Sequence, residues 1–153
     1  MRRSAAVVLY FAALASAALL LSAPAFGATE FIGSVKNVRG QAGIVREGRR
    51  TPAEPGLKLL PGDVLETGAD GSLGLILRDN SLLSLGPSSR VAIEEFLFVP
   101  AEKKLGLTAR ILRGTLAYVS GLIGRLAPES TTFVTPVATI GVRGTRFAVR
   151  VAE

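Results

Sequence analysis

The sequence has no cysteine, no histidine and no tryptophan among its 153 residues. Without cysteine, the chain forms no disulfide bond and offers no thiolate as a nucleophile or metal ligand. Without histidine, it cannot build a Ser-His-Asp triad, an imidazole general base or a His-containing zinc site. We therefore expect a protein that is not an enzyme and that holds neither a metal nor a cofactor.

The carboxylates do not suggest a site either. Asp63, Asp70 and Asp79 stand beside turn residues, without the spacing of an EF-hand loop or a calcium-binding repeat. Glu94 and Glu95 are neighbours, so in a regular strand they point to opposite faces and cannot act together as a glycosidase pair.

Basic residues outnumber acidic residues by 18 to 12, which gives a net charge of +6. A solvated, solubility-setting surface is the simplest interpretation, and attraction to anionic envelope polymers or lipids is the alternative. We expect no nucleic-acid binding, because no aromatic stacking pattern accompanies the basic residues.

The N-terminus has the layout of a secretory signal peptide. Arg2 and Arg3 precede an uncharged apolar run over residues 5–21, and small residues around Ala25 offer cleavage sites. We expect a helical signal peptide over residues 1–28 and a periplasmic or secreted domain over residues 29–153, without a membrane span after cleavage. The alternative is an uncleaved anchor, for which the apolar run is short of the roughly 20 residues that cross a bilayer.

Regularly spaced turns predict an all-β domain of short antiparallel strands. Turn residues recur at Asp70, Asp79 and Pro87, and leucines alternate with other residues over 73–77. Arg113-Gly114 is expected to reverse the chain, whereas residues 120–130 form either a short helical turn or a mobile connection. The spacing leaves a meander, a solenoid and a sandwich open as strand arrangements.

The C-terminal stretch predicts a half-buried strand. Phe147, Val149 and Val151 alternate with Arg146, Ala148 and Arg150. Before it, Thr135-Pro136 favours extended backbone. Gly141 and Gly144 flank Val142-Arg143 and predict a tight corner with the freedom for positive φ.

Four blocks resemble the FecR-like domains of bacterial envelope proteins, in the order of that family: GSVKNVRGQAGIVREG from residue 33, LLPGDVLETG from residue 59, RGTLAYVS from residue 113 and TPVATIGVRGTRFAV from residue 135. The resemblance implies a set of structural motif residues: Pro61, Gly62, Asp63, Thr135, Pro136, Gly141, Gly144, Thr145 and Phe147. Family members usually continue beyond the last block into another hairpin, so here we expect either a domain that closes early or one that is shortened at its C-terminal end.

The resemblance implies an exported, non-catalytic binding or signalling module that contacts a protein partner, such as a membrane sensor or an outer-membrane protein. Nothing like a cytoplasmic anti-sigma domain precedes the module, so direct anti-sigma activity is not expected. Arg143, Arg146 and Arg150 are the candidate partner-binding residues, although internal bracing is the first expectation for Arg143. One alternative is a structural scaffold that forms homo-oligomers through an edge strand. The other is polysaccharide binding, which is less favoured because the whole sequence has only nine aromatic residues.

Overall fold

The computed structural model describes residues 30–144 and 146–152, which form a β protein with one short helix. The predicted signal peptide over residues 1–28 and the motif residue Thr145 lie outside the described residues. The strands are β1 (Gly33–Arg39), β2 (Ala42–Arg46), β3 (Arg49–Pro52), β4 (Lys58–Leu59), β5 (Val64–Thr67), β6 (Ser72–Leu77), β7 (Leu82–Leu85), β8 (Arg90–Val99), β9 (Lys104–Val119), β10 (Thr131–Val134), β11 (Thr139–Gly141) and β12 (Arg146–Val151). The helical segments are the 3-10 turns η2 (Pro100–Glu102) and η3 (Pro128–Ser130) and the helix α2 (Leu122–Leu126).

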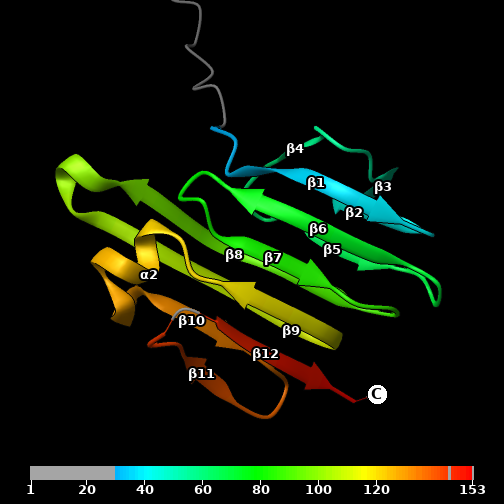
Figure 1. Cartoon of the computed structure of the whole chain (residues 1–153). Coiled ribbons are helices and arrows are strands. Elements are labelled where there is room, and N and C mark those ends of the chain that lie inside the picture. The colour runs from blue at the N-terminus through cyan, green and yellow to red at the C-terminus, as the bar shows by residue number, and fades with distance from the viewer. Residues whose placement is uncertain (1–29, 145, 153) are drawn as a thin grey trace, which may run out of the picture.

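The sheet curls into two layers that share β9 (Figure 1). The first half of β9 pairs with β8 and β10, and the second half pairs with β7 and β12. One layer therefore has the order β3-β2-β5-β8-β9-β10-β11, and the other has the order β4-β1-β6-β7-β9-β12. All pairs are antiparallel except β10 beside β9. The all-β prediction is confirmed, and of the arrangements left open by the sequence the structure is closest to the sandwich.

Gly114 allows β9 to serve both layers. Its φ is +85°, a left-handed conformation that glycine adopts without a Cβ clash. Before this point the buried side chains of β9 are at odd positions such as Leu107 and Ile111, and after it they are at even positions, Leu116 and Tyr118. The predicted chain reversal at Arg113-Gly114 is therefore wrong, because the strand continues through Gly114 and only changes the face that it buries.

A bulge in β8 corrects the expectation for Glu94 and Glu95. The pairing of β8 with β9 shifts by one residue between Ile93 and Glu95, and both glutamates are exposed. Beyond the bulge Phe96 faces the core opposite Leu107. An extra residue in one strand of an antiparallel pair produces this change of face. The two carboxylates therefore do not alternate across the sheet.

The core lies between the layers. Leu73, Leu75 and Leu77 of β6 are at most 2% exposed, as their alternation predicts. Burial of each contributes about 1.5–3 kcal/mol. The turns predicted at Asp70, Asp79 and Pro87 also separate consecutive strands in the structure.

A buried carboxylate fixes the short helix. Asp79 follows β6, and its side chain accepts hydrogen bonds from the Ser81 hydroxyl (2.7 Å) and the Ile123 amide (3.2 Å). The Ser81 hydroxyl in turn accepts a bond from the Gly121 amide at 3.0 Å. These bonds satisfy free amides at the start of α2. Residues 120–130 thus take the helical alternative rather than the loose connection.

Candidate functional site

The C-terminal strands form one open side of the molecule. β11 is the last strand of one layer and β12 is the last strand of the other. Figure 1 shows both at the lower edge of the view, and the corner over residues 142–144 follows β11. The predicted order of strand, corner and strand is therefore correct.

Three aromatic rings attach this side to the rest of the fold. The Phe133 ring lies 5.0 Å from the Tyr118 ring and 4.8 Å from the Phe147 ring, centroid to centroid. Phe133 of β10 and Tyr118 of β9 are at most 1% exposed. Phe147, a residue of the family motif, is half-buried at the start of β12. Phe147 therefore holds the edge strand against the rest of the fold, and we do not expect it to contact a ligand.

A capped turn joins β10 to β11. The Thr135 hydroxyl donates to the Ala138 carbonyl at 3.1 Å and accepts from the Ala138 amide at 3.0 Å. Pro136 and Val137 form the exposed tip, and Val137 is 92% exposed. Thr135 and Pro136 thus lie in the turn that joins β10 to β11.

The two glycines of the corner do not use their freedom for positive φ. Neither Gly141 nor Gly144 has a φ in the left-handed region, and a Cβ on either would meet no described atom within 4 Å. Nothing in the described residues explains why glycine stands at either one.

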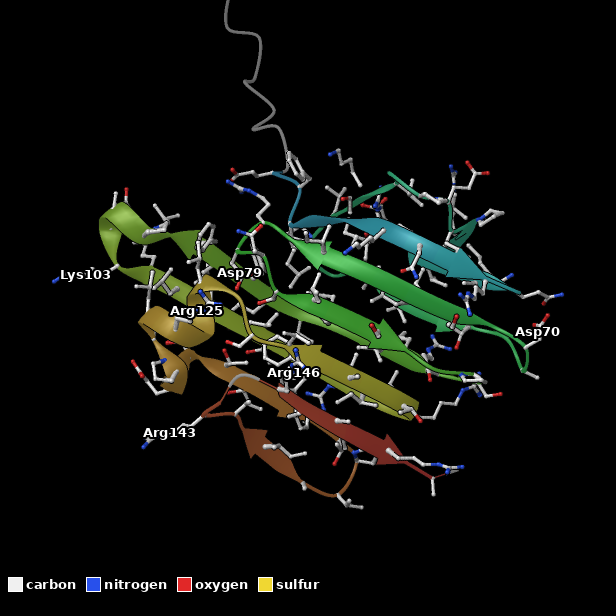
Figure 2. All side chains as sticks on the ribbon, viewed as in Figure 1. Asp70, Asp79, Lys103, Arg125, Arg143 and Arg146 are labelled. Atoms are coloured by element: carbon white, nitrogen blue, oxygen red, sulfur yellow. The ribbon has the colours of Figure 1, made fainter. Side chains whose placement is uncertain are left out.

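The candidate partner-binding arginines lie on this open side. Arg146 and Arg150 project from the exposed face of β12, and Arg143 is exposed in the corner. Figure 2 shows Arg143 and Arg146 pointing outward from this region. Among the described residues none of the three makes an ion pair or a side-chain hydrogen bond. The internal bracing expected of Arg143 is therefore not observed within that part of the chain.

An apolar groove runs beside these arginines. It has a volume of about 400 Å³ and lies between the Thr135–Ala138 turn and the second half of β12. Ile140, Val149 and Val151 line it and remain only half-buried. Sequence analysis missed the groove, because it forms only when the hairpin and the edge strand meet across the two layers.

The second block of motif residues lies far from this side and has a structural role. Gly62 has a φ of +84°, which makes the Pro61-Gly62 turn possible. Asp63 is fully buried and accepts two 2.7 Å bonds from the Arg46 guanidinium. It also accepts a 2.8 Å bond from the Leu60 amide. The motif therefore locks the turn before β5 onto β2.

Pairing with Asp63 changes the pKa of Arg46. Its hydrogen bonds to Asp63 raise the pKa of Arg46 above its ordinary value, with a smaller opposing effect of burial. A raised pKa on a basic group means stability that is present below the unfolded-state pKa and lost as the pH rises through the folded-state pKa. The ion pair is therefore retained from neutral pH into strong alkali. Arg46 could not be identified from the sequence as the partner of Asp63, because the two residues are 17 positions apart.

The described residues contain neither a membrane-spanning helix nor a cluster of metal-ligating side chains. Within residues 30–144 and 146–152, no helix is long and apolar enough to cross a membrane. In the same part of the chain, no group of three or more acidic, histidine or cysteine side chains could hold a metal ion.

A family model described as "FecR protein" matches residues 63–153. The match begins at the buried Asp63 and extends through β12, so it includes β9 and the whole open side. Strands β1 to β4 lie ahead of the matched region but share its sheet and core. Comparison with curated proteins and with solved structures gives no match.

Proposed function

The chain belongs to the FecR family of envelope signalling-related modules, and from this premise we propose that it is an exported, non-catalytic module that binds a protein partner. The family's domains work on the periplasmic side of the envelope. The partner would be a membrane sensor or an outer-membrane protein. The predicted leader over residues 1–28 supports export.

One observation supports protein binding above the other functions: the open side combines arginines that pair with no described residue and an apolar groove. Desolvated apolar contact and charged hydrogen-bonding groups are the components of protein interfaces. A polysaccharide site would instead present aromatic platforms, whereas Phe133 and Tyr118 are buried in the core.

In-cell cross-linking tests the proposal. The chain, with an affinity tag at its C-terminus, is produced in its native cells and treated with a short-range cross-linker. The control is the same tag exported behind residues 1–29 alone. We expect one envelope protein to be recovered covalently with the chain and not with the control. Recovery of the chain alone, or of the same proteins in both samples, contradicts protein binding.

A further inference from the structure

We propose that the edge of β12 that pairs with no described strand binds an acidic, extended polypeptide segment, which adds a strand to the sheet and places alternate aliphatic side chains over the groove. This inference rests on the proposed function, because it names the chemistry of the partner that the function requires. Four features of the described structure carry it: edge geometry, apolar spacing, charge, and exclusion of a second copy.

β12 is the sheet edge best suited to accept a strand. Among the described strands, β3, β4, β11 and β12 end the two layers. β4 has two residues and β11 has three, whereas β3 contains Pro52, which lacks an amide donor. β12 has six residues with neither a proline nor a register shift against β9. Shortness and proline protect an edge from further pairing, and β12 lacks both.

The inward-facing side chains of β12 are only partly covered by the rest of the described structure. Phe147, Val149 and Val151 alternate toward the interior and are each half-buried. Val149 and Val151 also line the groove. Side chains of a neighbouring strand lie about 5 Å from their cross-strand partners. An added strand would therefore place its own inward side chains against these valines and into the groove.

The charge around this edge requires an acidic partner. From Thr131 to Ala152, the segment that contains β10, β11 and β12, the chain has three arginines, Arg143, Arg146 and Arg150, and no acidic residue. Figure 2 labels Arg143 in the corner that precedes β12 and Arg146 at the start of β12. On β12 itself, Arg146 and Arg150 flank Ala148 on the exposed face. Glutamate or aspartate on the outward face of the added strand would pair with both arginines.

The same charge disfavours a second copy of this chain. An antiparallel pair of β12 strands centred on Ala148 would place Arg146 of one copy opposite Arg150 of the other. Like charges directly opposite each other destabilise a strand pair. Residues 1–29 of the chain are unsuitable as well, since they contain Arg2 and Arg3 and no acidic residue.

An anionic polymer or lipid would satisfy only the charge. A free strand edge presents a row of backbone N–H and C=O groups, and another polypeptide backbone matches that row. The regular backbone of β12 therefore favours a peptide segment over a polysaccharide or a membrane surface.

Peptide binding to the purified full chain tests the inference. The probe is a capped nine-residue peptide that alternates glutamate and valine, followed by fluorescence anisotropy. One control peptide replaces glutamate with lysine, and another has methylated amides on both edges. We expect the acidic peptide to bind at least about tenfold more tightly than either control, since it alone supplies both charge and backbone pairing.

Charge reversal locates the site. The double variant R146E/R150E should weaken binding of the acidic peptide at least about tenfold and favour the lysine peptide. The matched control R39E/R49E changes the net charge equally at exposed positions on β1 and β3, and we expect less than about a twofold change, allowing for screening by salt. Both pairs of side chains are exposed, and equal thermal midpoints would establish that both variants fold.

Amide hydrogen exchange separates strand addition from simple attraction. The acidic peptide should protect amides within residues 146–151 and leave residues 49–52 unchanged. Equal binding of the acidic and amide-methylated peptides would overturn the inference. So would displacement of the peptide by heparin or anionic vesicles without protection of β12, which would assign the surface to polyanions.

These outcomes are distinct from failure of the proposed function. Failure of every peptide to bind rejects the β12 edge, while a cross-linked envelope protein would still support protein binding elsewhere on the surface. Conversely, peptide binding without any cross-linked protein in cells rejects the proposed function and not the chemistry of the edge.

Discussion

Arg46 and Asp63 form an unequal ion pair, because the Arg46 side chain is 40% exposed and the Asp63 side chain is fully buried. Removing the arginine would leave a buried carboxylate with only the Leu60 amide as its partner. Removing the carboxylate would leave an arginine that can turn toward water. The two substitutions should therefore have different effects on stability.

We predict that Arg46→Met lowers the free energy of unfolding by about 3–5 kcal/mol, the usual effect of leaving a charge buried and unpaired. Asp63→Asn should lower it less, by about 1–3 kcal/mol. Urea denaturation followed by circular dichroism measures both. Glu94→Gln, which breaks the exposed pair between Glu94 and Arg110, is the control and should leave the midpoint unchanged. An equal loss for Arg46→Met and Glu94→Gln would contradict the structural role of the motif.

Gly114 and Gly106 offer a matched pair of glycines within β9. A Cβ at Gly114 would lie 2.4 Å from the Ser89 Cα, and the backbone there has a φ of +85°. A Cβ at Gly106 would meet Glu95 and Leu97 only at ordinary contact distances of 3.8 and 3.9 Å. The first position is therefore strained for any other residue and the second is not.

We predict that Gly114→Ala lowers the free energy of unfolding by at least about 2 kcal/mol, since left-handed backbone and a backbone clash both oppose alanine. Gly106→Ala should change it by no more than about 0.5 kcal/mol. Thermal denaturation of the two variants side by side measures the difference. Similar midpoints would show that β9 does not bend between layers at Gly114.

At the scale of elements, the C-terminal hairpin and β12 are held mainly by the Phe133 ring between Tyr118 and Phe147. We predict that Phe133→Ala lowers the free energy of unfolding by about 3–5 kcal/mol, the loss typical of a buried phenylalanine. Hydrogen exchange should become fastest over residues 131–151, because these strands lose their anchor first.

Phe31→Ala is the control for this substitution. Phe31 is 42% exposed, and its ring lies under the Lys58 ammonium at 4.4 Å. Its loss should lower the free energy of unfolding by about 1 kcal/mol or less. A Phe133 variant as stable as the Phe31 variant would mean that the open side is not integrated with the core.

Local patterns predicted the individual strands well and their connections less well. Leucine alternation over residues 73–77 identified β6, and Pro61-Gly62 identified the turn before β5. Glu94-Glu95 and Arg113-Gly114 were misread, because a bulge or a left-handed glycine inside a strand has the same local composition as a turn. Only pairing with distant residues distinguishes these cases, and a sequence pattern does not contain that information.

The candidate site shows the same limit. The alternation around Arg146 and Arg150 predicted a strand with one buried and one solvent-exposed face, and the structure places both residues on the exposed face. The groove beside them was not predictable, since Ile140 and Val151 approach only after the chain passes between the layers.

For the whole molecule, we predict a monomer, because Arg146 and Arg150 would repel each other in a pair of β12 strands. Sedimentation velocity of the full chain should give one species whose sedimentation coefficient does not change with protein concentration. The variant R146E/R150E carries like charges of the opposite sign at the same places and should also be monomeric. Dimers of the native chain that dissociate in this variant would support the scaffold alternative.

Site-specific photo-crosslinking in living cells tests whether the edge of β12 binds a different protein. A photoreactive amino acid is placed at Ala148 on the exposed face of β12, and in a second strain at Thr51 on β3 at the far edge of the other layer. We predict a covalent adduct with a different protein from position 148 only, and its loss when R146E/R150E is added. Adducts of equal yield from both positions, or an adduct between two copies of this chain, would contradict a partner-binding edge at β12.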